Sequence, residues 1–140
     1  MRAPTLEVTD TPDQEDLEAI GSALAAFNQA DVGPAERKAL AVLVRDGKGL
    51  IVAGISGYTA WGWLYVQWLF VAESHRGQGL AGQMLAAAEA EAIRRGCRGA
   101  YIDTFNPQAL NVYERAGYRV FGALPDFPKG RSRSFLSKTL

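Results

Sequence analysis

The amino-acid sequence predicts a single α/β (α+β) domain over residues 1–140, built on a mixed central sheet of about seven strands flanked by helices. Apolar residues recur with the period of strands in some segments and with the period of helices in others, in the order β-α-β-β-β-α-β-α-β-β. One long helical segment lies between two strand-like segments, and such a connection implies a right-handed parallel crossover. Short turns elsewhere favour antiparallel pairing.

The first elements are a short strand and a helix. Residues 5–8 have the composition of a short strand. Asp13 then has the chemistry of a helix cap, because its carboxylate can accept hydrogen bonds from the free N–H groups of a first helical turn. Apolar residues follow at helical spacing, namely Leu17, Ile20, Leu24 and Phe27. We expect residues 28–34 to end this helix.

A β-hairpin and a long third strand come next. Residues 39–45 and 50–58 read as strands, and the glycine-containing turn between them predicts that they pair. After a break at Gly62, residues 63–71 form an aromatic-rich strand. Simple alternation places Leu64, Val66, Trp68 and Phe70 on one face and Tyr65, Gln67, Leu69 and Val71 on the other. Both faces are expected to be largely buried.

The second half of the chain supplies the crossover helix and the remaining strands. The helix runs from Leu80 to about Arg95 and stops at Gly96, because glycine commonly closes helices. Its apolar stripe consists of Leu80, Met84, Ala88 and Ala92. The remaining elements are a strand over residues 100–105, a helix that Pro107 opens and Gly117 closes, and strands over residues 118–124 and 134–140.

Composition and charge exclude several classes of protein. Lys plus Arg and Asp plus Glu both number 15, and a chain of zero net charge lacks the basic surface that nucleic-acid binding needs. No apolar stretch is long enough to cross a membrane, and residues 1–4 lack the features of a signal peptide, so we expect a cytoplasmic protein. One cysteine excludes an internal disulfide. Acidic residues crowd the first segment, which hints at a cationic substrate.

Residues 76–82 read Arg-Gly-Gln-Gly-Leu-Ala-Gly and form a glycine-rich turn between a strand and a helix. Successive N–H groups at a helix start can converge on phosphate oxygens, and the glycines keep side chains out of the way. The run lacks the Lys-Ser/Thr of a mononucleotide loop. Residues 77–82 match a dinucleotide pattern by letter, but no βαβ unit precedes them. The ligand expected from these residues is a phosphorylated cofactor.

Residues 76–81 resemble the Arg/Gln-x-x-Gly-x-Gly/Ala pyrophosphate loop of the GCN5-related N-acetyltransferase (GNAT) superfamily. Residues 106–118, Asn-Pro-Gln-Ala-Leu-Asn-Val-Tyr-Glu-Arg-Ala-Gly-Tyr, resemble a second segment of that superfamily, Asn-x-x-Ala-x-x-x-Tyr-Glu-x-x-Gly-Tyr/Phe. The tail resembles small bacterial members of unassigned substrate. The resemblance implies the GNAT fold, acetyl-coenzyme A (acetyl-CoA) as co-substrate, no metal, and a possible homodimer.

The resemblance also assigns roles. Tyr113 matches the usual general acid, and a phenol with an ordinary pKa of about 10 can donate a proton to a departing thiolate; on periodicity alone it would be a packed aromatic. Asn106 would bind the pantetheine arm, cap the helix at Pro107, or do both. Arg76 would either neutralise pyrophosphate or remain solvated. The cofactor-binding residues implied are Leu69, Phe70, Val71, Arg76, Gly77, Gln78, Gly79, Leu80, Ala81, Asn106, Ala109 and Tyr113.

No residue is an obvious general base. Some superfamily members carry a glutamate on the strand before the loop, but Tyr65, Gln67 and Leu69 offer no carboxylate there, so a water relay is one possibility. Glu73, His75 and Asp103 have suitable groups, although a bland structural role is favoured for each. Cys97 precedes the strand over residues 100–105 at the end opposite the glycine loop, roughly 20 Å away. We expect an inert thiol and direct transfer.

Three functions are compatible with these patterns. The first is an N-acetyltransferase that moves an acetyl group from acetyl-CoA to a primary amine of a small molecule or protein. The second, which the missing base favours, is a non-catalytic acyl-CoA sensor or interaction module. The third is a nucleotide-binding protein of another fold. The three tryptophans, Trp61, Trp63 and Trp68, are expected mostly in the core, although Trp61, next to Gly62, could instead line an acceptor pocket.

Overall fold

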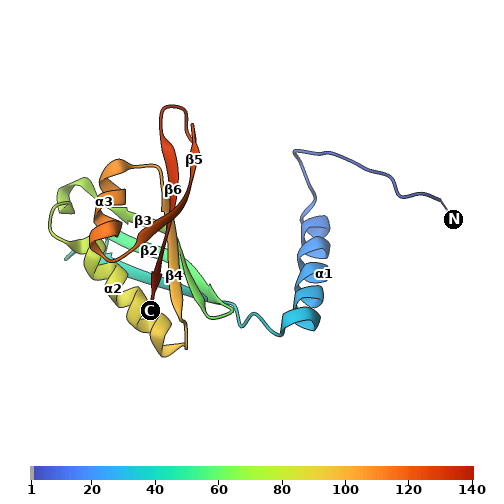
Figure 1. Cartoon of the computed structure of the whole chain (residues 1–140), viewed down its shortest axis with the longest axis horizontal. Coiled ribbons are helices and arrows are strands. Elements are labelled where there is room, and N and C mark those ends of the chain that lie inside the picture. The colour runs from blue at the N-terminus through green and yellow to red at the C-terminus, as the bar shows by residue number, and fades with distance from the viewer. Residues whose placement is uncertain (1) are drawn as a thin grey trace. The chain divides into compact units, whose positions relative to one another are not determined.

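The computed structural model describes residues 2–140, which divide into two compact units, residues 2–35 and residues 36–140 (Figure 1). The first unit contains the helix α1, Gln14–Val32, and no residue of α1 is buried. The second unit contains the sheet, the other helices and every residue of the hydrophobic core. The single domain expected over residues 1–140 stays a prediction.

Two N-terminal elements, the strand over residues 5–8 and the helix after Asp13, differ from what the sequence predicts. The predicted strand over residues 5–8 is wrong, because these residues are irregular and Leu6 and Val8 are exposed. A strand needs a neighbour for its backbone hydrogen bonds, and here none pairs with it. The helix begins after Asp13, as predicted, but continues to Val32, and Gly33 at φ +91° ends it. Its apolar stripe, Leu17, Ile20, Leu24 and Phe27, is exposed.

Six strands form one mixed sheet in the order β1-β2-β3-β4-β6-β5. The strands are β1 Lys38–Arg45, β2 Ile51–Ala60, β3 Trp63–Val71, β4 Gly99–Thr104, β5 Arg119–Pro125 and β6 Ser132–Thr139. β3 and β4 pair in parallel, as the crossover predicts, and all other neighbours are antiparallel. The α/β class and the mixed sheet are confirmed, with six strands rather than about seven because residues 5–8 add none.

Two helices accompany the sheet in the second unit, α2 Leu80–Arg94 and α3 Pro107–Arg115, and a short 3-10 turn, Glu73–His75, precedes the glycine loop. α2 packs against β1, β2 and β3, whereas α3 packs against β4 and α2. The predicted stripe of α2 faces the core, since Met84, Ala88 and Ala92 are buried and Leu80 packs at its edge. Both helices lie to one side of the sheet (Figure 1).

The predicted faces of β3 are wrong beyond Val66, because a bulge interrupts the alternation. Gly57 of β2 pairs with Val66, and Ser56, the residue before it, pairs with Trp68. β3 therefore has one extra residue, at position 67, that has no partner in β2. Leu69 and Val71 therefore join the core side, while Trp68 and Phe70 point away from it and are 67% and 58% exposed. The expectation that both faces are buried fails for the same reason.

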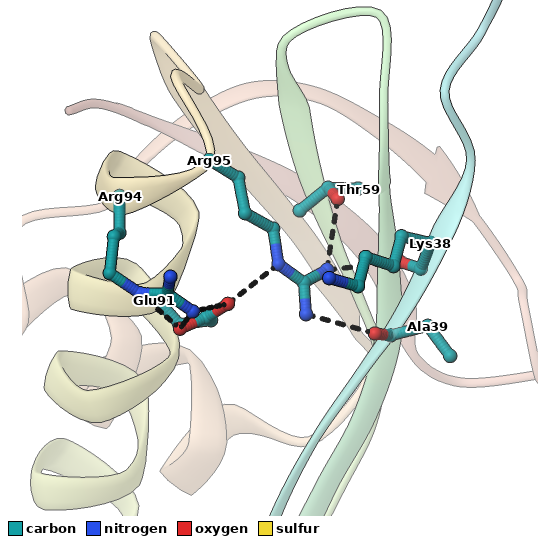
Figure 2. Close-up of polar contacts among 6 residues, drawn as sticks. All are labelled: Lys38, Ala39, Thr59, Glu91, Arg94 and Arg95. Atoms are coloured by element: carbon teal, nitrogen blue, oxygen red, sulfur yellow. Dashed lines mark hydrogen bonds and ion pairs between the residues drawn. The ribbon is translucent and has the colours of Figure 1, made fainter.

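The C-terminal end of α2 is tied to the first two strands by one arginine (Figure 2). The guanidinium of Arg95 donates hydrogen bonds to the carbonyls of Lys38 and Ala39 at 3.2 and 3.1 Å and to the Thr59 hydroxyl at 3.1 Å. Its Nε also donates to Glu91, which pairs with Arg94 as well. These bonds fix the end of α2 remote from the glycine loop, so the loop end of the helix is held in place too.

A second polar network joins α2 to the last strand through a buried carboxylate. Glu89 accepts hydrogen bonds from the Tyr118 hydroxyl at 2.9 Å and from the Lys138 ammonium at 2.7 Å. Lys138 also donates to the Ala116 carbonyl at 2.8 Å. A buried charge is tolerated when it is paired in this way.

Among residues 2–140, no helix is both long and apolar enough to cross a membrane.

Candidate functional site

The centre of the sheet opens between its two parallel strands. The ladder joins β3 to β4 only from the pair Trp63–Gly99 to the pair Val66–Ile102. Beyond this point β3 continues to Val71 paired with β2 alone, and the last residues of β4 pair with β6 alone. Backbone groups along one edge of residues 67–71 therefore have no strand beside them. The two strands therefore splay apart at Leu69, Phe70 and Val71, three of the residues predicted to bind the cofactor, and the free edge can pair with an extended ligand.

The glycine loop presents free N–H groups at the start of α2. Gly77 and Gly79 both have a φ close to +78°, at 78° and 77°, a conformation that glycine adopts without strain. The first bond of the helix is donated by Gln83 to the Gly79 carbonyl, and no side chain caps the helix. The N–H groups of Leu80, Ala81 and Gly82 thus have no partner within residues 2–140. Such a helix start binds anions.

The splay and the loop line the same cavity, of about 710 Å³. The predicted cofactor-binding residues line it with one exception, Gln78. Two arginines, Arg76 and Arg115, and one histidine, His75, lie along it, whereas the lining contains no aspartate or glutamate. A cavity of this size and charge matches a large anionic ligand, and the residues present fit the phosphates that the sequence predicts.

Arg76 has a structural role in addition to any role in ligand binding. Its Nε donates a hydrogen bond to the Val71 carbonyl at 3.0 Å, which links the loop to the end of β3. The side chain is exposed, so the rest of its guanidinium remains available to an anion. The two sequence-based alternatives, a pyrophosphate contact and a solvated arginine, therefore both stay predictions.

Tyr113 lies at the wall of the cavity on α3. Its side chain is buried, and its hydroxyl makes no hydrogen bond to any residue between 2 and 140. Burial, together with the charge of Asp103, raises the pKa of Tyr113 to about 12 from an ordinary 10.0. The phenol is therefore a neutral donor at physiological pH, with its proton free for a ligand. Its burial also bears out the packed aromatic that periodicity predicts.

Asn106 caps α3 and lines the cavity at once. Its Oδ1 accepts hydrogen bonds from the N–H groups of Gln108 and Ala109 at 2.8 and 3.2 Å. Pro107 follows at the first helical position, as expected for a helix start. Because the carbonyl oxygen of the side chain is occupied by the cap, its amide N–H₂ group is the part left to donate to a ligand.

The three candidate bases lie in different surroundings. His75 lines the cavity, and its Nδ1 is 2.9 Å from the Ser74 hydroxyl. Glu73 belongs to the 3-10 turn before the loop and does not line the cavity. Asp103 is bonded to Tyr65 and to Arg133 and does not line it either. The cavity itself thus brings no carboxylate to Tyr113.

Cys97 is remote from this chemistry. The residue is buried just before β4 and is not part of the cavity wall. Burial raises the pKa of the thiol, which lowers the fraction of the nucleophilic thiolate. Both observations agree with the inert thiol expected from the sequence.

Part of the cavity wall that α3 and its C-terminal end contribute was not predicted from the sequence. Gln108, Val112, Arg115 and Ala116 line the cavity beside the predicted residues Ala109 and Tyr113. A signal was available only for Ala116, which lies three positions after Tyr113 and so shares its side of the helix; the spacing from Tyr113 does not indicate the other three. The expected core placement of the tryptophans is wrong, because Trp61, Trp63 and Trp68 are all exposed, and Trp61 does not line this cavity.

Comparison with known proteins gives consistent matches. Residues 6–118 match the model of the acetyltransferase (GNAT) family. An acetyltransferase of Agrobacterium fabrum is 46% identical over 131 residues, which cover 94% of this chain and 96% of the relative. A blasticidin-S acetyltransferase of Streptomyces morookaense is 38% identical over 94 residues, covering 66% of this chain and 69% of the relative.

A solved structure has the same fold over the whole chain. A crystal structure from Agrobacterium tumefaciens superposes with a TM-score of 0.93 at 44% identity and covers 98% of this chain and 100% of its own. At this similarity the resemblance extends over the glycine loop, the splay and the helix that carries Tyr113.

Proposed function

This chain belongs to the acetyltransferase (GNAT) family, and from that premise we propose that it transfers an acetyl group from acetyl-CoA directly to a primary amine. The family membership supports acyl transfer in general. The finer assignment depends on one observation, namely that a single cavity joins the free N–H groups of the glycine loop to the hydroxyl of Tyr113. The two ends of a CoA thioester require these two kinds of group.

Each part of acetyl-CoA has a matching part of the cavity. The pyrophosphate would accept hydrogen bonds from the N–H groups of Leu80, Ala81 and Gly82 at the positive end of α2. The pantetheine amides would pair with the free edge of β3 at residues 69–71 and with the side-chain amide of Asn106. The thioester would then lie in the splay near Tyr113.

Tyr113 acts as the general acid in this proposal. The amine nitrogen attacks the thioester carbonyl carbon, a C–N bond forms, and the C–S bond breaks. The amine loses a proton to water, because the cavity wall has no carboxylate. The departing thiolate takes its proton from the Tyr113 hydroxyl, and water restores the phenol. The products are the N-acetylated amine and the CoA thiol.

One relative favours a narrower class of acceptor than primary amines in general. By its name, the relative from Streptomyces morookaense acts on blasticidin S, a small molecule. The acidic side chains of the first unit, among them Glu15 and Asp16, agree with a cationic acceptor. We therefore place small cationic amines first among the acceptors to be tested.

A second function, an acyl-CoA sensor without turnover, is favoured by one specific observation. The cavity holds a free tyrosine hydroxyl but no aspartate or glutamate, so the proton of the amine has no side-chain acceptor in the wall. A sensor would need the anion site and the splay and could dispense with a base.

The first experiment is calorimetric titration of the protein with acetyl-CoA, with ATP and NAD as controls. Micromolar binding selective for acetyl-CoA is expected, because the ligand fills the cavity from the loop to the splay. Thiol release is then measured with a panel of primary amines. Binding of ATP or NAD at the same site would indicate a nucleotide-binding protein instead, and the absence of any binding would remove the transferase and the sensor together.

Replacement of Tyr113 by Phe separates the two functions. The change keeps the ring and removes the hydroxyl, so we expect unchanged affinity for acetyl-CoA and a turnover number lower by about 100-fold, the size of a lost acid catalyst. A wild-type protein that binds acetyl-CoA and releases no thiol above the rate of hydrolysis with any amine would favour the sensor.

A further inference from the structure

The side of the sheet opposite α2 and α3 carries a bonded cluster of polar side chains. Leu64 and Val66 of β3 and Ala100 and Ile102 of β4 face the core, so the residues between and after them point to the other side. Tyr65, Asp103 and Arg133 are such residues, on β3, β4 and β6 respectively. No helix of residues 36–140 packs against this side.

Asp103 is held rigidly at the centre of the cluster. Its Oδ2 accepts a hydrogen bond from the Tyr65 hydroxyl at 3.0 Å, and its Oδ1 pairs with the guanidinium of Arg133 at 2.8 and 2.9 Å. Oδ1 is thereby fully used, whereas Oδ2 can accept one more hydrogen bond. The Asp103 side chain is 9% exposed, so it is not fully closed off from solvent.

The cluster lies where the two parallel strands separate. Tyr65 is one pair before the last pair of the ladder, and Asp103 follows directly after it. The carboxylate is also close enough to Tyr113 for its charge to act on that phenol, although the two residues belong to opposite sides of the sheet. Asp103 does not line the cavity, but it lies where the two strands separate, so a donor occupying the cavity would leave this side of the sheet as the approach for a second reactant.

Aromatic rings lie beside the two residues that hold the carboxylate. Tyr65 and Tyr101 are stacked with ring centroids 4.6 Å apart. The guanidinium of Arg133 lies 4.6 Å from the ring of Phe127 and 5.9 Å from that of Phe105, and both rings are half-exposed. Exposed rings beside a hydrogen-bond acceptor suit a ligand with an amino group on a flat apolar body.

We propose that Asp103 binds the amino group of the acceptor through its Oδ2, and that the rings around it select an acceptor whose amine is attached to a flat, apolar body. That the bound amine is the acceptor depends on the proposed function. That Asp103 forms an amine site depends on the geometry alone. Tyr65 and Arg133 are positioning residues, because they hold Asp103 and do not contact the amine themselves.

The test is the binding of amines to the full-length protein saturated with CoA, which lacks the acetyl group and so allows no turnover. 2-Phenylethylamine serves as the flat amine, and ethanolamine as an amine without an apolar body. Calorimetry should show tighter binding of the first. Asp103→Asn should weaken it by about tenfold, the effect of losing a hydrogen bond between charged partners.

Matched variants control for the fold. Tyr101→Phe keeps a ring of the same stack and leaves both bonds to Asp103, so its amine affinity should equal that of the wild type. Tyr65→Phe removes one bond to Asp103 while its ion pair remains, and should weaken the amine by a smaller factor. Affinity for CoA should stay unchanged in all three, and the melting temperature should stay unchanged in Tyr101→Phe, whereas Asp103→Asn should lower it because Arg133 loses its ion pair. If Asp103→Asn does not fold, Tyr65→Phe provides the same test.

Two results would overturn the proposal. One is that Asp103→Asn binds 2-phenylethylamine as tightly as the wild type does. If that variant does not fold, the same result with Tyr65→Phe counts instead. The other is a wild-type protein that binds neither amine. Failure of the proposed function would appear differently, as amine binding that depends on Asp103 without any thiol release from acetyl-CoA.

Discussion

Tyr113 differs from its neighbours Tyr65 and Tyr118 in what its hydroxyl does. The hydroxyls of Tyr65 and Tyr118 donate to carboxylates, Asp103 and Glu89, and serve to hold those groups. The Tyr113 hydroxyl has no partner within residues 2–140 and faces a cavity. Among the described residues no buried side-chain nitrogen or oxygen lacks a partner, so this hydroxyl is open to the cavity and is more readily understood as part of a site than as part of the core.

The pKa of Tyr113 can be measured without any substrate. Tyrosine ionisation is followed by ultraviolet absorbance, and the titration of Tyr113→Phe is subtracted from that of the wild type. Because burial and Asp103 raise the pKa to about 12, the difference signal should be absent at pH 10 and appear only above pH 11. Activity should accordingly show no loss between pH 8 and 10 that arises from this phenol. A difference signal half complete at pH 10 would contradict the buried placement.

At the level of elements, the bulge between β2 and β3 determines which side chains reach the site. Without the extra residue at position 67, strict alternation would turn Trp68 and Phe70 into the core and Leu69 and Val71 away from it. The bulge lies where β3 also leaves β4, so one local irregularity accompanies both the change of face and the splay. Bulges near active sites commonly have this function.

Gly57 is the residue that makes the bulge possible. A Cβ atom at this position would lie 1.9 Å from the Tyr65 carbonyl oxygen, a contact that the backbone must move to relieve. Gly57→Ala should therefore lower the free energy of unfolding by about 2 kcal/mol or more and weaken acetyl-CoA binding, since the splay would shift with the strand. Chemical denaturation and calorimetry measure the two effects.

Gly122→Ala is the matched control for this change. Gly122 is also a strand glycine at a register shift, but a Cβ atom there would meet nothing within 4 Å. Its free energy of unfolding should stay within about 0.5 kcal/mol of the wild type. Equal stability of the two variants would show that the bulge tolerates a side chain.

The sequence predicted the elements of the second unit and the residues along the cavity, because both depend on local patterns. Helix starts such as Asn106-Pro107 and glycines with positive φ such as Gly79 are encoded within a few residues. The bulge, the exposed side of β3 and the cluster around Asp103 depend on pairing between distant strands, which periodicity does not contain. Gly57 was the one available signal, since a glycine inside a strand often marks a bulge.

At the scale of the whole molecule, the two units differ in how they are stabilised. Every residue of the core cluster belongs to residues 36–140, whereas α1 buries no side chain. The predicted ligand site likewise lies within the second unit. Stability gained from a ligand should therefore be distributed unequally along the chain.

Hydrogen exchange with and without acetyl-CoA tests this distribution. At about 100 times the dissociation constant, a ligand stabilises the state that binds it by about 2.7 kcal/mol. Exchange should slow in β3, α2 and α3, with the largest effect at residues 77–82, whose N–H groups would gain partners. Residues 14–32 should exchange at an unchanged rate. Protection of α1 as strong as that of α2 would contradict the assignment of the site to the second unit.

The network at Glu89 has a consequence for how the protein would tolerate the acetyl-CoA that we propose as its co-substrate. Acetyl thioesters modify lysine amines that they encounter, and an acetylated lysine loses the charge that pairs it. Lys138 is the lysine whose loss of charge would leave the Glu89 carboxylate buried without a counter-ion. Its amine is committed to Glu89 and to the Ala116 carbonyl and is mostly covered, at 28% exposure. The lysine on which the fold depends is thus the one shielded from self-acetylation.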